Sequence, residues 1–300
     1  MGMPDDLPAV ADLTDGITTE AHRHPASAGV LHLCLTSRML SEDDRCRVED
    51  ADLFVRRVGD GSPLLMIAGG IGSADSFTAL ARRLGESYTV LTYDRRGHFR
   101  SAYDGPMSVA GHAADARAVI EHFGYSKALV YGSSAGAQIA LELATRHPEA
   151  VDGLVAHEPP AVRLLPDADE WLEFAAEQAA DGDIVAAFKN FLGSIAGAAL
   201  PDLKTIRLPK EDEWRTLFER ELVQFYDYLP DTDALRGTRV PIVLAAGEGS
   251  RGYYHYRPAR ALALELGLPF VEMPGAHLAP LRTSAAFAAA LSQILTDLLV

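Results

Sequence analysis

The 300-residue sequence contains little cysteine and little positive charge. Its two cysteines, Cys34 and Cys46, are too few for a disulfide scaffold or a cysteine-based zinc site, and thiols of this kind are usual in the cytosol. The 27 basic residues face 42 acidic ones, which gives a formal net charge of −15. Because phosphate groups repel an acidic surface, we expect neither nucleic acid nor an anionic membrane as a partner.

Long apolar runs and targeting signals are absent too. No uninterrupted apolar run approaches the roughly 18 residues that a membrane-spanning helix needs. The start of the chain has no basic region of the signal-peptide kind, and Asp6 does not fit the myristoylation pattern. With 48% apolar and 23% charged residues, the composition is that of a globular domain, and we expect it in the cytoplasm.

The segment 127–147 combines an apolar run, a turn rich in small residues and a helical pattern. Residues 128–131 are typical of a buried strand, residues 132–136 read GSSAG, and apolar side chains then recur at helical spacing. A strand, the G-x-S-x-G pattern and a helix together indicate a nucleophile elbow, although a turn without chemistry would use similar residues. Ser134 would stand at the apex, and the N–H of Ala135 would point toward a developing oxyanion.

Strand-like and helix-like segments alternate from residue 63 to about 160 and resume at 240. This alternation predicts an α/β fold with a mostly parallel sheet flanked by helices. Residues 161–236 look helical throughout and contain both tryptophans, so we expect a helical cap inserted into a core formed by 29–160 and 237–300. Residues 1–28 show no clear period and are expected to form a loose N-terminal arm.

Two further strand-like patches precede the regular alternation. They cover residues 30–35 and 53–58 and are separated by a charged segment. We expect them to form an antiparallel pair at one edge of the sheet.

Polar side chains that directly follow predicted strands should meet at one edge of the sheet. Four such residues are Ser134, Glu158, Glu248 and His277. A serine hydroxyl becomes a nucleophile when an imidazole takes its proton and a carboxylate stabilises the imidazolium. His277 is the best candidate for the base, because the Pro-Gly-x-His loop at 274–277 can present its ring in a tight turn.

The glycine-rich loop at residues 68–72, AGGIG, follows another predicted strand. It lacks the full G-x-G-x-x-G pattern and no lysine follows it, so neither a dinucleotide site nor a P-loop is supported. We expect no cofactor and no metal. The loop should lie beside the elbow, where the N–H of Gly70 could act as a second oxyanion donor.

The sequence resembles the α/β-hydrolase superfamily over about residues 45–300. The resemblance rests on the Gly69-Gly70 loop, the YDRRGHFRS segment at 93–101, the GSSAG turn, the helical insertion and the Pro-Gly-x-His loop, in that order. Two positions depart from the family pattern. Ala68 stands where the family usually has histidine before the loop glycine, and Ser250 occupies the usual position of the acid.

The resemblance leaves two glutamates as candidates for the acid. Glu248 lies two residues before the usual position, at the end of the same predicted strand. Glu158 follows the strand after the elbow helix. The resemblance allows an acid at this place, since some members of the superfamily carry theirs at the end of that strand. Two prolines directly after Glu158 stiffen its loop. We favour Glu158 and retain Glu248 as the alternative.

The expected activity is hydrolysis of an ester, lactone or related acyl bond through an acyl-Ser134 intermediate. Aromatic residues of the cap favour a small, mainly apolar substrate, and a homodimer is left open. The alternatives are a non-hydrolytic lyase or cyclase with the same fold, and a catalytically idle ligand-binding receptor.

Overall fold

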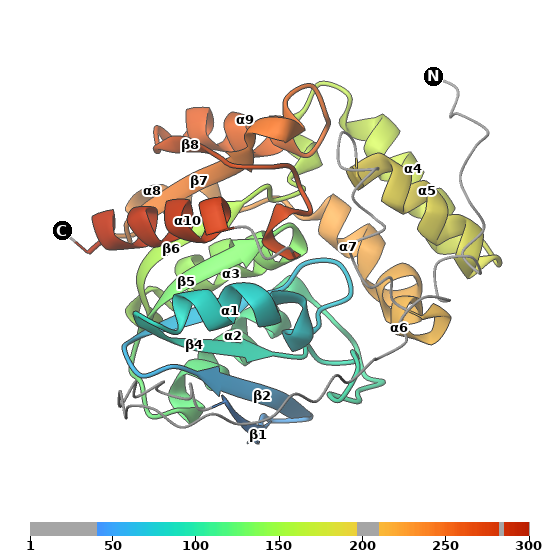
Figure 1. The fold of residues 1–300 in the computed structure, drawn as a ribbon. Coiled ribbons are helices and arrows are strands. Elements are labelled where there is room, and N and C mark those ends of the chain that lie inside the picture. Colours follow the sequence, from blue (N-terminus) through green and yellow to red (C-terminus); the bar gives the residue numbers. More distant parts are fainter. Residues whose placement is uncertain (1–40, 197–209, 282–284, 300) are drawn as a thin grey trace, which may run out of the picture. The chain divides into compact units, whose positions relative to one another are not determined.

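The computed structural model describes residues 41–196, 210–281 and 285–299 (Figure 1). The arm expected at 1–28 and the strand expected at 30–35 lie outside the described residues.

An eight-stranded sheet organises the described residues, in the order β1-β2-β4-β3-β5-β6-β7-β8. The strands β1 and β2 and the strands β2 and β4 pair antiparallel, and all other neighbours pair parallel. This arrangement confirms the predicted mostly parallel sheet. The bounds are β1 Ser41–Arg47, β2 Asp52–Val58, β3 Ser62–Ile67, β4 Tyr88–Tyr93, β5 Ala128–Ser133, β6 Val151–His157, β7 Ile242–Gly247 and β8 Phe270–Met273.

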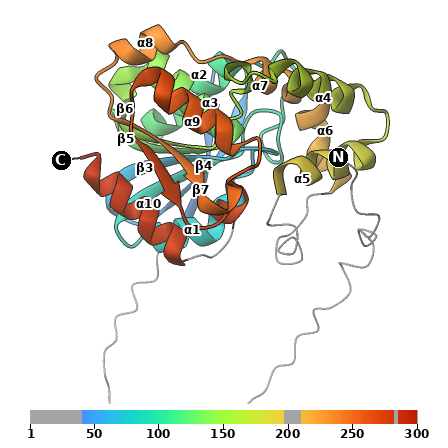
Figure 2. The same ribbon diagram turned by 90° about the horizontal axis from the view of Figure 1, so that it is seen from above.

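Helices cover both faces of the sheet, because the parallel strands alternate apolar side chains between two cores (Figure 2). Leu65 and Ile67 of β3 face α2 and α3, whereas Leu64 and Met66 of the same strand face α1 and α10. The helices of the first face are α2 Val109–His122, α3 Ala135–Arg146, α8 Thr232–Gly237 and α9 Tyr256–Leu266, and those of the second are α1 Thr78–Leu84 and α10 Ala285–Asp297.

A group of helices between β6 and β7, which we call the cap helices, packs around its own aromatic cluster. They are α4 Ala168–Ala180, α5 Ile184–Ala196, α6 Glu211–Thr216, the π-helical turn Leu217–Glu221 and α7 Leu222–Asp227. Phe188 and Trp214 stack with ring centroids 3.6 Å apart, and Phe191 meets Phe218 edge to face. The same cluster includes Leu278, next to His277, so the cap helices rest on the loop that carries the candidate base.

The first strand of the edge pair is the charged segment that we expected to separate two strands. Six side chains of β1, SEDDRCR, are exposed and only Cys46 is buried, because β1 lies at the sheet edge. Such a strand shows no apolar alternation, and its charges protect an edge from further pairing. None of the described helices is long and apolar enough to span a membrane.

The crossing of α3 over β3 yields a stability prediction. A Cβ at Gly136 would lie 2.1 Å from the carbonyl oxygen of Ile67, which is backbone and cannot move aside. We expect Gly136→Ala to lower the free energy of unfolding by at least about 1–3 kcal/mol, the usual cost of overpacking. Urea denaturation measures this, with Gly182→Ala as the control because its Cβ would meet no atom within 4 Å. Equal stability of the two variants would contradict so close a crossing of α3 and β3.

Candidate active site

Ser134 occupies a strained turn between β5 and α3. Its backbone has φ 56° and ψ −126°, a positive-φ conformation that costs a non-glycine residue on the order of 1–3 kcal/mol. The chain tolerates it because the neighbouring positions are small: a Cβ at Gly69 would lie 2.6 Å from the Ser134 Cβ, and one at Gly132 would lie 2.4 Å from the Gly136 oxygen. The turn therefore holds the Ser134 side chain at a fixed place above the strand end.

Sheet register brings Glu158 beside this turn. Ser133, the last residue of β5, pairs with His157, the last residue of β6, so the next residue of each strand leaves the sheet at the same level. The amide of Ser134 donates to the His157 oxygen at 2.8 Å, which ties the two strand ends together. Glu158 also has a positive φ, 49°, and this turns its side chain away from the strand direction.

The Glu158 carboxylate is fully buried and lies against His277. Its Oε2 is 2.6 Å from His277 Nδ1, and its Oε1 accepts from the Gly247 amide at 2.8 Å. Burial alone would raise the pKa of Glu158, but the hydrogen bond to His277 and the surrounding imidazoles hold it well below its usual range. Because an ionised carboxylate only accepts, Nδ1 of His277 carries a proton, so in the neutral ring Nε2 is the acceptor.

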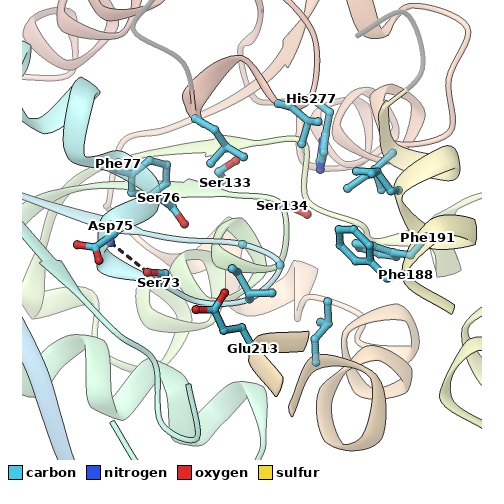
Figure 3. Close-up of a pocket in the computed structure, with 18 of the residues that line it drawn as sticks. Ser73, Asp75, Ser76, Phe77, Ser133, Ser134, Phe188, Phe191, Glu213 and His277 are labelled. Carbon is cyan, nitrogen blue, oxygen red and sulfur yellow. Dashed lines mark hydrogen bonds between the residues drawn. The ribbon is translucent and has the colours of Figure 1, made fainter. Parts of the chain in front are cut away.

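Ser134 and His277 line the same cavity, and the ring of His277 extends toward Ser134 (Figure 3). The structure thus brings together three of the four strand-end residues singled out in the sequence. The fourth, Glu248, is exposed, and it is absent from the hydrogen bonds and ion pairs of His277 among the described residues.

Of the two residues expected to supply oxyanion donors, Ala135 directly follows Ser134, and Gly70 lines the same cavity as Ser134. Ala135 begins α3, so its N–H has no intrahelical acceptor. Gly69 packs against the same peptide, since its Cβ position is 3.3 Å from the Ala135 nitrogen. Gly70 follows with φ 47°, and its carbonyl accepts from the Arg95 guanidinium at 2.7 Å.

His255 is a neighbour of the site that the sequence did not indicate. Its ring centroid is 4.5 Å from that of His277, and its Nε2 lies 3.1 Å from the Ser250 hydroxyl and 3.7 Å from Glu158 Oε2. The sequence places it in an aromatic loop, YYHY, with no spacing that links it to residue 277. Ser250, at the usual acid position of the resembled family, instead holds this second imidazole.

Glu158, His255 and His277 offer donor atoms within 4.8 Å of one another, a spacing that a metal ion could use. The hydrogen bond between Glu158 and His277 already occupies two of these three donors, so the arrangement suits proton transfer better than metal binding.

The cavity has a volume of about 310 Å³ and is lined mainly by apolar side chains. Phe188 and Phe191 lie on one side, and Ser73, Asp75 and Ser76 lie on the other (Figure 3). The remaining apolar lining is formed by Ile71, Phe77, Phe99, Leu192, Ile195, Leu217, Leu278 and Leu281.

Comparisons with known proteins agree with this architecture. A family model described as the alpha/beta hydrolase fold matches residues 62–224. An uncharacterized hydrolase of Bacillus subtilis, YraK, is 33% identical over 243 residues, which cover 77% of this chain and 88% of that protein.

Two solved structures show the same fold at low sequence identity. A thermophilic esterase from Thermogutta terrifontis is 18% identical with a TM-score of 0.69, covering 86% of this chain and 100% of that one. An enol-lactonase from Burkholderia xenovorans is 18% identical with a TM-score of 0.65, covering 85% of this chain and 99% of that one.

The chain belongs to the alpha/beta hydrolase family. It is accordingly a hydrolase, and the predicted fold class and family are confirmed.

The buried imidazoles predict how stability depends on pH. Burial lowers the pKa of His157 to about 4 and that of His255 to about 3. Between these values and the unfolded value of about 6.5, the unfolded chain binds protons that the native state does not, so stability falls as the pH falls. We expect the free energy of unfolding to decrease from pH 6.5 toward pH 4, by up to about 1.4 kcal/mol per pH unit for each histidine.

Urea denaturation at several pH values measures this dependence. His255→Asn should have a shallower slope than the native chain, because it lacks one of these two buried imidazoles. An unchanged slope in His255→Asn would show that the imidazole is not kept neutral by burial.

Proposed function

We propose that the protein is a serine hydrolase that cleaves an ester, lactone or related acyl bond through an acyl-Ser134 intermediate. The observation that carries this proposal is the strained Ser134 turn, which opens on the same cavity as a His277 ring held by a buried carboxylate. A turn without chemistry has no need of a serine at φ 56°, where glycine would be unstrained.

The proposed reaction has two acyl-transfer steps. Ser134 Oγ attacks the substrate carbonyl while His277 Nε2 takes its proton, and the N–H groups of Gly70 and Ala135 stabilise the oxyanion. The leaving alcohol takes the proton from His277 as its bond to the acyl carbon breaks. Water then attacks the acyl-enzyme by the same route, returning the serine proton and releasing the acid.

Glu158 is the proposed acid of this site. Its ionised carboxylate holds the His277 ring by Nδ1 and stabilises the imidazolium that forms when Nε2 is protonated. The exposed Glu248 makes no such contact among the described residues.

The substrate is proposed to be a small molecule with an apolar group. Phe188, Phe191 and Leu192 offer an apolar wall, and the net charge of −15 disfavours anionic substrates. The fold itself supports acyl chemistry, since an esterase and an enol-lactonase share it. We expect nitrophenyl butyrate to be hydrolysed faster than nitrophenyl succinate; the reverse order would contradict the proposed specificity.

Replacing the nucleophile tests the mechanism. Ser134→Ala should lower kcat by at least about 10³-fold and leave the fold intact, since loss of a triad member leaves only the contribution of binding and the oxyanion donors. Steady-state kinetics with a nitrophenyl ester measure this. Ser133→Ala, the adjacent serine in the same turn, is the matched control and should retain most of the activity. A Ser134→Ala variant with more than about a tenth of native kcat would exclude the acyl-serine route.

Replacing each glutamate by its amide identifies the acid. Glu158→Gln should lower kcat on the order of 10⁴-fold, because the amide keeps the shape but loses the charge that stabilises the imidazolium. Glu248→Gln, at the end of the neighbouring strand, should have little effect. An active Glu158→Gln variant together with an inactive Glu248→Gln variant would assign the acid to Glu248 instead.

A further inference from the structure

A buried ion cluster lies where the cap helices meet the sheet core. The guanidinium of Arg95, which follows β4, is 2.8 Å from the carboxylate of Glu221, and their side chains are 0% and 1% exposed. Glu221 ends the π-helical turn, a rare geometry that often marks functional positions. The Nε2 atoms of His98 and His112 lie 2.9 and 2.8 Å from its two carboxylate oxygens.

The same guanidinium reaches the glycine loop. Nη2 of Arg95 donates to the Gly70 oxygen at 2.7 Å, and the Arg95 amide donates to the Gly72 oxygen at 2.9 Å. A Cβ at Gly72 would lie 2.5 Å from Arg95 Nε, so the guanidinium runs directly along this loop. One nitrogen, Nη2, thus joins Gly70 to Glu221 of the cap helices.

Gly70 needs such a support. It has no Cβ, its φ is 47°, and among the described residues no atom other than those of its chain neighbours lies within 4 Å of the place where a Cβ would be. The turn around Gly70 is closed by the Gly72 amide, which donates to the Gly69 oxygen at 2.9 Å. Within that turn the hydrogen bond from Arg95 holds the Gly70 carbonyl, which no side chain of its own helps to fix.

The neighbouring Arg96 shows what a purely structural pair looks like in this loop. It binds Asp115 through two nitrogens, Nε and Nη2, both at 2.6 Å, in the bidentate geometry that gives the strongest pairing. Arg95 does not pair with Glu221 in this bidentate way, but contacts it through Nη2 alone. Its Nε and Nη1 are buried without a hydrogen-bond partner among the described residues. Its Nη2 contacts the Gly70 oxygen, Glu221 and, at 3.2 Å, His98 Nε2.

We infer that Arg95 is a positioning residue that fixes the Gly70 oxyanion donor, and that Glu221 makes this fixation depend on the seating of the cap helices. The inference rests on the oxyanion role proposed for Gly70. A cap displaced from the core would withdraw Glu221 from Arg95 and loosen Gly70, so the site is fully assembled only with the cap helices in place.

The test compares Arg95→Met, Arg95→Lys and the double variant Arg95→Met/Glu221→Met with a control, Asp115→Asn. The double variant removes both charges, and replacing a buried ion pair by apolar residues often preserves stability. The control breaks the other buried pair of the loop without touching Gly70. For each folded protein we would measure kcat and KM with a nitrophenyl ester and the rate of phosphonylation by a fluorophosphonate.

Arg95→Met and the double variant should lose about 10- to 100-fold in kcat and in phosphonylation rate, with KM changed less than about threefold, because an oxyanion donor acts mainly in the transition state. Arg95→Lys should recover part of the loss, since one ammonium can replace Nη2. Asp115→Asn should stay within about threefold of the native rates.

Two results would overturn the inference: native kcat in the folded double variant, or an equal loss in Asp115→Asn, which would indicate general loosening of the loop. A different pair of results would show that the proposed serine-hydrolase function itself is wrong. In that case the native protein would not be phosphonylated, and Ser134→Ala would leave its turnover unchanged.

Discussion

The close approach of β3, β5 and α3 around Ser134 is the constraint on which the site depends. Three glycines, Gly69, Gly132 and Gly136, each lie where a Cβ would come within about 2.6 Å of another main-chain or serine atom. This crowding holds the serine in a strained positive-φ conformation that it would not adopt alone. The packing of the sheet and its helices thereby offsets the backbone strain at one residue, Ser134, at the end of β5.

The second organising feature is a buried charge. Glu158 is held by a backbone amide of β7 and by His277, so its carboxylate links the ends of two strands to the loop after β8. Removing water from a carboxylate is costly unless its oxygens are hydrogen-bonded. The same bonds that offset this cost also fix the tautomer and orientation of the imidazole, so stability and the proposed chemistry use one set of contacts.

Most of the fold was predictable from the sequence, because strand and helix patterns and the turns between them are local. The strand β5, the turn at Ser134 and the helix α3 follow from one 21-residue segment, 127–147. The strand β1 was not predictable by pattern, since an edge strand with one buried side chain has no apolar alternation.

The site was predictable only in part. Ser134, Glu158 and His277 stand out because each directly follows a strand, but the sequence alone left Glu158 and Glu248 as competitors. In the structure Glu158 contacts His277 and Glu248 is exposed, a difference that arises from tertiary geometry. His255 and the pair of Arg95 with Glu221, 126 residues apart, depend on tertiary packing and leave no local signal.

The most direct test of the account is the chemical identity of the intermediate. A nitrophenyl acetate reaction, quenched in acid before the steady state, can be digested and analysed by mass spectrometry for an acetyl group. We predict one acetyl group per chain on the peptide that contains Ser134, located at Ser134 by fragmentation. Turnover without any acylated peptide, or acetyl groups that accumulate at another residue on the catalytic timescale, would contradict the account.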